Sequence, residues 1–367
     1  MTEESNGSTS EAAIGKLVRP ALIASEYTAR GYSMFLRYLL VGLADESVTA
    51  ALVYPPGQDV DSVVSPSVEV IEHPAVDLPL MGIPNRKILF ERLERFKPTV
   101  LHCLCESQAS LTRQLARELD LPYILAVNSL QKRFGRLSIS RSRCAKIIVP
   151  AKSIAGNVSE LYPEFSDRIE QINIGTFVTK KAVCFSESGR LASMLTVHPL
   201  DNVGEFEKLI GAVKHLVVNG YEFMLVIMGG GRAESGLREL LASEGLLQTV
   251  IIIPRLEPWR SVLGAGDIFV QPQPRTAFDP LLLEAMSVGT AVAGCKGGVD
   301  DLFIDGQTAV VFDPNDELSI YSCLQGLFDR RELARKIAKG AQEYLKKNHT
   351  VSNMISSILR CYHEAQH

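Results

Sequence analysis

Short runs of nearly uninterrupted apolar residues alternate with longer segments of helical spacing along most of this chain. In the first half, the pattern predicts strands at residues 20–26, 48–55, 68–74, 99–106 and 122–128, and helices at residues 34–44, 85–97 and 107–119. Residues 145–162 are predicted to form a strand, a turn and a helix, and residues 167–177 a strand followed by a glycine turn. Apolar strands separated by helices are typical of a parallel sheet that is buried on both faces.

The same rhythm starts again in the second half. Strands are predicted at residues 193–200, 223–231, 249–256, 267–273 and 290–295, and helices at residues 203–220, 234–245, 257–266 and 279–289. Residues 297–312 are predicted to form a loop with a short strand, and three helices close the chain. The pattern therefore predicts an α/β protein with two doubly wound domains in tandem. Ligands of such sheets bind beyond the carboxyl ends of the strands, so we expect a cleft between the two domains.

Length and charge narrow the class of protein. The 367 residues are enough for about two domains. The 38 Lys and Arg residues nearly balance the 42 Asp and Glu residues, which argues against a nucleic-acid partner. Residues 1–16 are polar and acidic and are expected to form a disordered tail; they resemble neither a secretory signal nor a transit peptide. No run of about 18 uncharged apolar residues occurs, so no membrane-spanning segment is expected, while peripheral contact with a membrane stays open.

The cysteines indicate the cellular compartment. Seven cysteines without metal-binding spacing favour reduced thiols and a cytoplasmic protein. Cys103 and Cys105 form a C-x-C pattern inside an apolar run, which is more typical of core side chains on one strand face than of a metal site. We therefore expect neither a metal site nor a bound cofactor.

Residues 267–312 carry a recognisable pattern. DIFVQPQ is followed by AFDPLLLEAMSVGTAVAGCKGGVDDLFIDGQTAVVF, which resembles the donor-binding region of GT-B glycosyltransferases, in particular glycosyltransferase family 4. Residues 145–177 and 223–237 resemble further segments of that family. The resemblance implies two Rossmann-like domains that face each other across a cleft. It implies an acceptor domain at 17–177, a nucleotide-sugar donor domain at 178–345 and a C-terminal helix, residues 346–367, that crosses back to the first domain.

The resemblance also implies donor-binding residues. Glu284 corresponds to a glutamate that holds the ribose hydroxyls, although a polar position on an amphipathic helix is the alternative. Phe278 leads into a helix whose amides at Leu281 and Leu282 would face the diphosphate. Asp279 and Pro280 equally fit an ordinary helix start, and an acidic cap would repel phosphate. The remaining donor-binding residues implied by the resemblance are Gly229, Gly230, Arg255, Leu256 and His198.

Several positions depart from the family pattern. Thr276 stands where the family has a first glutamate, and Asn128 stands where it often has a histidine. His102 is a candidate base, but its apolar surroundings favour a core histidine. Thr276, His102 and Asn128 are the catalytic candidates. The basic pair that neutralises the diphosphate is missing from residues 196–206, where His198 is the one potential cation. Three arginines on other loops are potential substitutes: Arg232, Arg260 and Arg275.

Two functions follow from these observations. The first is a glycosyltransferase that moves a sugar from a nucleotide-diphosphate sugar to an unknown acceptor, with retention and without a metal ion. The alternative is a noncatalytic GT-B protein that binds in its cleft or acts as a scaffold for a protein partner. An epimerase or a phosphorylase on the same fold is a weaker third interpretation, because the basic or histidine-rich cleft that these reactions need is not evident.

Overall fold

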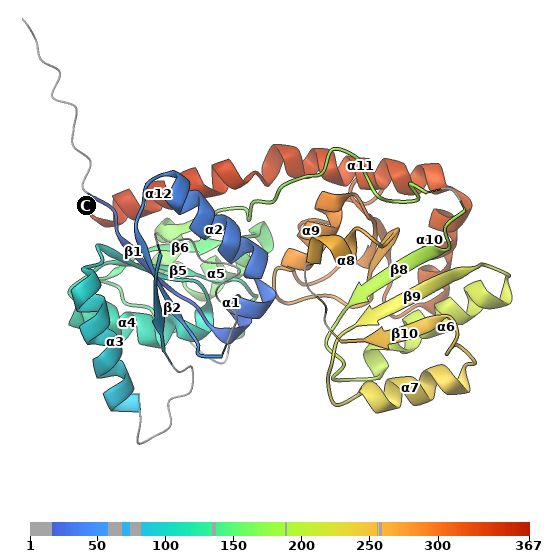
Figure 1. Cartoon of the computed structure of the whole chain (residues 1–367), viewed down its shortest axis with the longest axis horizontal. Coiled ribbons are helices and arrows are strands. Elements are labelled where there is room, and N and C mark those ends of the chain that lie inside the picture. The colour runs from blue at the N-terminus through green and yellow to red at the C-terminus, as the bar shows by residue number, and fades with distance from the viewer. Residues whose placement is uncertain are drawn as a thin grey trace, which may run out of the picture.

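A computed structural model describes residues 17–57, 68–73, 82–133, 137–187, 189–254, 256 and 259–367. It consists of two α/β domains that lie side by side, and the last helices of the chain run along both (Figure 1). The tail expected at residues 1–16 lies outside the described residues.

The first sheet has seven parallel strands in the order β3-β2-β1-β4-β5-β6-β7. The strands are β1 (Pro20–Ile23), β2 (Ala50–Tyr54), β3 (Val68–Glu72), β4 (Val100–Cys103), β5 (Tyr123–Ala126), β6 (Cys144–Val149) and β7 (Ile169–Gln171). Its helical segments are α1 (Glu26–Gly31), α2 (Ser33–Asp45), α3 (Gly82–Phe96), η1 (Glu106–Gln108), α4 (Ala109–Glu118), α5 (Lys152–Leu161) and η2 (Pro163–Arg168).

The second sheet has six parallel strands in the order β10-β9-β8-β11-β12-β13. The strands are β8 (Ala192–Val197), β9 (Phe223–Met228), β10 (Val250–Ile253), β11 (Ile268–Gln271), β12 (Ala291–Cys295) and β13 (Val310–Phe312). The helices are α6 (Gly204–Val218), α7 (Glu234–Ser243), α8 (Trp259–Leu263), α9 (Pro280–Val288), α10 (Glu317–Asp329), α11 (Arg331–Asn348) and α12 (Val351–Ala365).

These two sheets confirm the predicted pair of doubly wound α/β domains. The central strands are buried along their whole length, which explains why they lack the alternation of half-exposed strands. The structure adds one element between the strand predicted at residues 20–26 and the helix predicted at residues 34–44: Ser25 caps the short helix α1 there. The Ser25 hydroxyl accepts a hydrogen bond from the Thr28 amide at 3.1 Å, a common N-cap arrangement.

The C-terminal helices join the two domains. Helix α11 packs on α9 and β12 of the second domain, and α12 packs on α2, β5 and β6 of the first. The change of partner occurs at His349, whose backbone carbonyl accepts a hydrogen bond from the Thr176 amide at 2.9 Å. Gly175 lies so close to Val351 that a Cβ there would come within 2.5 Å of the Val351 Cα. The last helix therefore closes the first domain beside the crossover segment that leads into the second.

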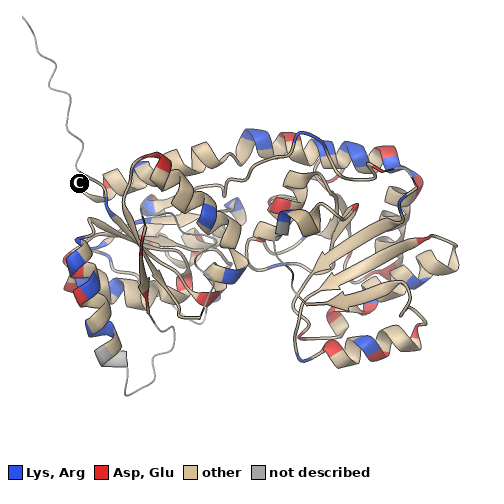
Figure 2. Cartoon of the chain, viewed as in Figure 1, with Lys and Arg blue, Asp and Glu red and all other residues tan. Residues whose placement is uncertain are grey.

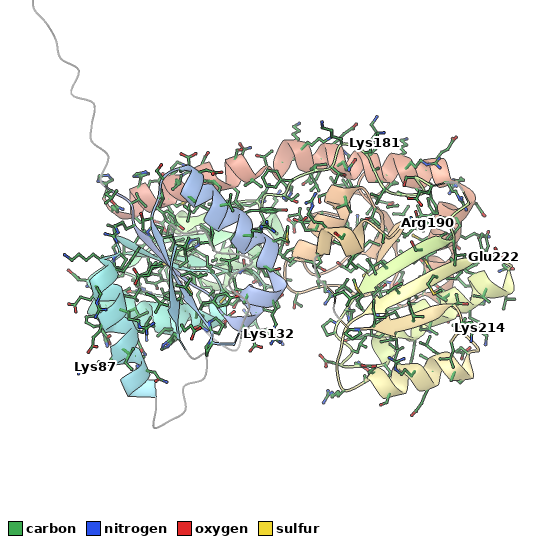
Figure 3. All side chains as sticks on the ribbon, in the orientation of Figure 1. Lys87, Lys132, Lys181, Arg190, Lys214 and Glu222 are labelled. Carbon is green, nitrogen blue, oxygen red and sulfur yellow. The ribbon has the colours of Figure 1, made fainter. Side chains whose placement is uncertain are left out.

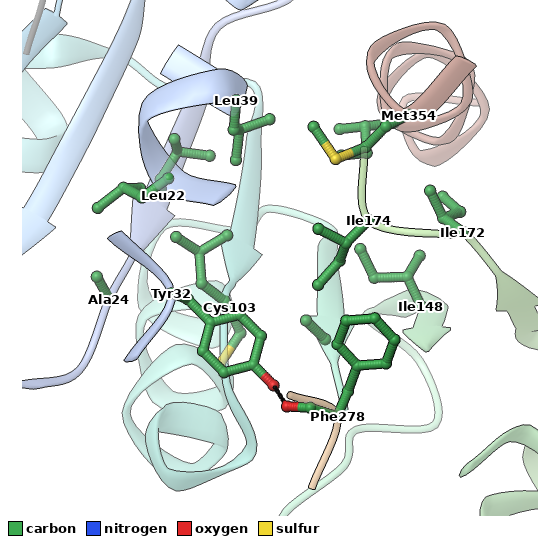
Figure 4. Packing of buried hydrophobic residues seen from close by; sticks show 14 of the residues in the cluster. Leu22, Ala24, Tyr32, Leu39, Cys103, Ile148, Ile172, Ile174, Phe278 and Met354 are labelled. Carbon is green, nitrogen blue, oxygen red and sulfur yellow. Dashed lines mark hydrogen bonds between the residues drawn. The ribbon is translucent and has the colours of Figure 1, made fainter. Parts of the chain in front are cut away.

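A phenylalanine of the second domain lies within the core of the first. Phe278 is 2% exposed and belongs to the same apolar cluster as Ile148, Ile174 and Met354. The Tyr32 hydroxyl donates a hydrogen bond to the Phe278 carbonyl oxygen at 2.8 Å (Figure 4). The segment just before α9 is thus held against the first domain, and this contact fixes one wall of the space between the domains.

Charged side chains of both signs are distributed over the helices that cover the sheets, without a large region of one sign on the face in view (Figure 2). The described helices include none long and apolar enough to cross a membrane.

Candidate functional site

A cavity of about 240 Å³ opens between the two domains. Three adjacent strands, β9, β8 and β11, end at it, and the strand order reverses between β8 and β11. The reversal point of a doubly wound sheet is where ligands bind, because the loops after the two strands diverge there. The lining residues are Tyr27, Gly31, Val197, His198, Pro199, Met228, Gly229, Gly230, Arg275, Ala277, Phe278, Asp279, Pro280 and Leu281.

His198 follows β8 and is 6% exposed. Its Nε2 lies 2.8 Å from a carboxylate oxygen of Glu205, whereas its buried Nδ1 has no hydrogen-bond partner among the described residues. Burial and the nearby Arg275 lower the pKa of His198, although the contact with Glu205 opposes this shift. His198 therefore lines the cavity and carries one buried ring nitrogen without a hydrogen-bond partner among the described residues.

Arg275 follows β11 and supplies a positive charge to the cavity. Its guanidinium donates to the Val197 carbonyl oxygen at 2.7 Å, and its buried Nε has no partner in the described part of the chain. Gly298 fixes the loop behind it: the Val299 amide bonds the Arg275 carbonyl oxygen at 2.7 Å. A Cβ at Gly298 would lie 2.1 Å from that oxygen, and φ is +68° there, so only glycine fits without strain.

Gly229 and Gly230 follow β9 and bring bare backbone to the cavity. A Cβ at Gly229 would lie 2.1 Å from the His198 carbonyl oxygen, so glycine is needed there for packing. A Cβ at Gly230 would meet no atom within 4 Å. Packing therefore does not explain the glycine at 230, which presents open backbone to the cavity.

Helix α9 begins at the cavity with Asp279 as its N-cap. The Asp279 carboxylate accepts hydrogen bonds from the amides of Leu281 and Leu282, at 2.9 and 3.4 Å, and Pro280 has no amide to offer. Leu281 lines the cavity. Leu282 is buried and does not appear in the lining. Both amides that the resemblance assigns to the diphosphate are thus bonded within the chain.

Glu284 lies one turn further along α9 and is 2% exposed. One carboxylate oxygen accepts from the Thr176 hydroxyl at 2.8 Å, and the other lies 2.7 Å from an Arg260 nitrogen. Burial raises the pKa of Glu284, and Arg260 and Thr176 counteract the rise. This carboxylate does not line the cavity described above. It connects α9 to the crossover segment. The ribose contact expected from the sequence stays a prediction, and Glu284 would have to exchange its bonds to Thr176 and Arg260 for bonds to the ribose.

Two catalytic candidates lie at a contact between the domains. The Leu130 amide donates to the Thr276 carbonyl oxygen at 2.7 Å, and the Phe278 amide donates to the Asn128 carbonyl oxygen at 2.9 Å. The Asn128 side chain donates to the Leu104 carbonyl oxygen at 2.8 Å. Asn128 therefore links strand ends of the first domain to the second. Thr276 is exposed beside the cavity, with Arg275 and Ala277 in its lining.

The third catalytic candidate lies elsewhere. His102 is fully buried on β4, with its Nδ1 2.7 Å from the Tyr362 hydroxyl of α12. Burial lowers the pKa of His102 to about 3. The position is that of a core histidine, and it does not suit a base that contacts a substrate.

Two donor-binding candidates and three candidate cations from the sequence analysis remain to be located in the structure. Leu256 is 45% exposed, and Arg255 lies outside the described residues. Of the three potential substitute cations, Arg275 lines the cavity, Arg260 is bonded to Glu284, and the Arg232 side chain donates to the Asp201 carbonyl oxygen at 3.3 Å.

Tyr27 is a lining residue that the sequence analysis missed. It is 56% exposed, belongs to α1 of the first domain and faces the cavity from the side opposite His198's sheet. Its position just after β1, at the carboxyl edge of the sheet, is the signal that could have identified it. Within the described part of the chain, no group of three or more His, Cys, Asp or Glu side chains is arranged to hold a metal ion, and all seven cysteines are free.

Part of this chain is similar in sequence to known glycosyltransferases. Residues 187–344 match the family model described as Glycosyl transferases group 1. Sulfoquinovosyl transferase SQD2 of Arabidopsis thaliana is 26% identical over 145 residues, an alignment that covers 38% of this chain and 28% of that protein. The matching region is thus less than a third of the length of this curated relative.

Solved structures resemble nearly the whole chain. A glycosyltransferase from Rickettsia africae ESF-5 has a TM-score of 0.77 at 15% identity and covers 95% of this chain and 99% of its own. Sucrose-phosphate synthase from Thermosynechococcus elongatus has a TM-score of 0.77 at 15% identity, and Anabaena HepE in complex with UDP has 0.76 at 12%; each covers 94% of this chain and 98% of its own. This chain therefore has the GT-B fold, and residues 187–344 are similar to the glycosyl transferases group 1 family.

Proposed function

We propose that this protein is a glycosyltransferase that takes a sugar from a nucleoside-diphosphate sugar held in the cavity between its domains. The observation that carries the proposal is the pairing of Arg275 with the unused Nδ1 of His198 at the reversal point of the second sheet. The names of the similar proteins support it: one is a sulfoquinovosyl transferase and another was solved with UDP.

The leaving diphosphate is the part of the donor that these groups suit best. Arg275 supplies a positive charge for it, and a charge-assisted hydrogen bond of this kind contributes about 1.5–3 kcal/mol. Glu205 holds the Nε2 hydrogen of His198, so Nδ1 of the neutral ring accepts from a hydroxyl of the donor, and it donates to a phosphate oxygen only when the ring is protonated. The open face of Gly230 lets a phosphate or a ribose approach the backbone. We include metal independence in the proposal, because Arg275 supplies positive charge for the diphosphate. We include retention because the resemblance to the family implies it.

The sugar and its acceptor belong on the side of the first domain in this proposal. Tyr27 presents an exposed aromatic ring to the cavity. The chemical identity of the acceptor is outside the proposal, and the name of the Arabidopsis relative makes a glycolipid acceptor one class to include in an assay.

Turnover with a panel of UDP- and GDP-sugars tests this function. We expect donor hydrolysis or transfer by the wild type, and a loss of roughly tenfold or more on Arg275→Gln. The matched control is Lys214→Gln, which removes a positive charge at the outer end of the second domain (Figure 3). Absence of turnover with every donor, or equal turnover of wild type and Arg275→Gln, would contradict the proposal.

A noncatalytic binding protein is the second candidate, favoured by Thr276. This residue has a hydroxyl where the resembled family has its first glutamate, and its carbonyl is bonded to the first domain. Because its side chain is exposed, Thr276→Glu fits without repacking. In a weakened enzyme the added carboxylate should raise turnover, whereas in a noncatalytic protein both forms should bind the nucleotide without turnover.

A further inference from the structure

Helix α9 directs its N-terminus into the cavity, yet the amides there are already occupied. Asp279 accepts from the amides of Leu281 and Leu282, and Pro280 supplies no third amide. The N-terminus of a helix favours anions because its free amides and its dipole both point outward. In this chain a carboxylate attached to the helix takes the position that an external anion would take.

Two other residues that line the same cavity carry nitrogen atoms without hydrogen-bond partners among the described residues. His198 is 6% exposed and its Nδ1 has no partner among the described residues; the buried Nε of Arg275 is likewise without one. Arg275 and Asp279 line the same cavity as His198, and Glu205 holds His198 at Nε2. Arg275 Nε can only donate, whereas His198 Nδ1 accepts in the neutral ring and donates when the ring is protonated, so together they suit a ligand that carries acceptor oxygens beside a hydroxyl group.

We propose that the Asp279 carboxylate occupies the place of a bound phosphate at the N-terminus of α9. It thereby determines which anionic ligands this protein accepts in the cavity. This inference rests on the proposed function and concerns the same site. A diphosphate must be held from the side of His198 and Arg275, while the negative charge at α9 repels it. The site therefore discriminates against phosphate groups placed at the helix and lowers the affinity for nucleoside diphosphates.

Asp279→Asn isolates this effect, because asparagine caps a helix about as well as aspartate but carries no charge. We expect Asp279→Asn to bind UDP and inorganic pyrophosphate roughly tenfold or more tightly than the wild type, which corresponds to removing one nearby like charge. Binding of uridine, which has no phosphate, should not change. The gain should shrink at high salt, because screening weakens the repulsion.

Asp316→Asn is the matched control. Asp316 caps α10 in the same way, with its carboxylate accepting from the Leu318 amide at 2.9 Å, and it is absent from the lining of the cavity. The substitution changes the net charge by the same amount, so any general electrostatic effect should appear in both variants. Thermal melting of both proteins checks that the caps still form.

The outcomes of calorimetry separate this inference from the proposed function. Tighter UDP binding by Asp279→Asn, with unchanged uridine binding and an unaffected Asp316→Asn protein, supports the inference. Measurable and equal UDP affinity in all three proteins overturns the inference but leaves the proposed function standing. Failure of all three proteins to bind UDP, GDP or pyrophosphate overturns both. A parallel gain in uridine affinity overturns the inference about Asp279, because the substitution would then act through the shape of the cavity rather than through its charge.

Discussion

Several single residues at the cavity, among them Phe278 and Leu281, were predicted from the sequence through its resemblance to a known family. His198, Gly229 and Gly230 lie near the carboxyl ends of the strands predicted at residues 193–200 and 223–231, and the structure brings them together at one edge of the second sheet. Arg275 was one of three interchangeable candidates, because sequence spacing does not say where a loop arginine points. The role of Glu284 was assigned by resemblance. Its partners Thr176 and Arg260 are 108 and 24 positions away, so no local pattern could have revealed them.

His102 gives this protein an acid-sensitive core. Because its pKa is about 3 in the folded state and about 6.5 in the unfolded chain, the unfolded chain binds more protons between these values. The free energy of unfolding should therefore be fully retained above pH 6.5 and fall as the pH decreases, by about 2 kcal/mol from this residue at pH 5. Urea unfolding at pH 7 and pH 5 measures the loss.

The comparison protein for this experiment is His102→Leu combined with Tyr362→Phe, which replaces both hydrogen-bonded partners with apolar groups. It should lose less free energy of unfolding between pH 7 and pH 5 than Tyr362→Phe alone, which keeps the histidine. An equal loss in the two proteins would show that His102 does not carry the pH dependence.

Gly230 tests how closely a ligand approaches the backbone. Since a Cβ there meets no protein atom within 4 Å, Gly230→Ala should keep the melting temperature of the wild type within a few degrees. It should weaken UDP binding severalfold if the ligand lies against this backbone. Gly229→Ala is the contrasting variant and should destabilise the fold, because its Cβ would collide with the His198 carbonyl. Unchanged UDP affinity in Gly230→Ala would remove this glycine from the site.

At the scale of elements, α9 connects the two domains and also borders the cavity. Its sequence, with an acidic residue among leucines, suggested a functional carboxylate at Glu284. The structure gives a physical reason for the charge that needs no ligand: it satisfies Arg260, which also bonds the Phe177 carbonyl oxygen in the crossover segment. Most strands and helices along the chain followed from the apolar pattern, whereas the face that α9 turns toward its neighbours depends on contacts between distant segments.

Glu284→Gln should therefore destabilise the protein by about 2 kcal/mol, because it leaves the half-buried Arg260 without its counter-charge. Glu234→Gln is the control, since its ion pair with Arg238 is exposed and should contribute little. Denaturant unfolding of both variants measures the difference. A Glu284→Gln protein with normal stability and reduced UDP affinity would instead support the ribose contact expected from the sequence.

At the scale of the whole molecule, the two-domain architecture followed from the repeated strand and helix rhythm, because parallel sheets have a clear apolar signature. The way the domains join did not follow. The pairing of residues 128–130 with 276–278 and the insertion of Phe278 into the first domain depend on tertiary geometry that one sequence does not encode locally.

Phe278→Ala should loosen this joint. Removing a buried phenylalanine costs about 3–5 kcal/mol when the site cannot collapse, and here that loss falls on the contact between the domains. Small-angle scattering should report a larger radius of gyration, while Leu247→Ala, at a residue 54% exposed on the second domain, should leave it unchanged. An unaltered radius in a folded Phe278→Ala protein would argue that other contacts hold the domains together.

The central claim is that the cavity between the domains binds the diphosphate of a nucleotide sugar through Arg275. Calorimetric titration of UDP and GDP into the wild type, Arg275→Gln and Lys214→Gln tests it most directly. The account predicts binding of at least one nucleotide by the wild type and by Lys214→Gln, and an affinity roughly tenfold or more lower for Arg275→Gln. Equal affinities in a correctly folded Arg275→Gln protein, or no binding of either nucleotide by the wild type, would contradict it.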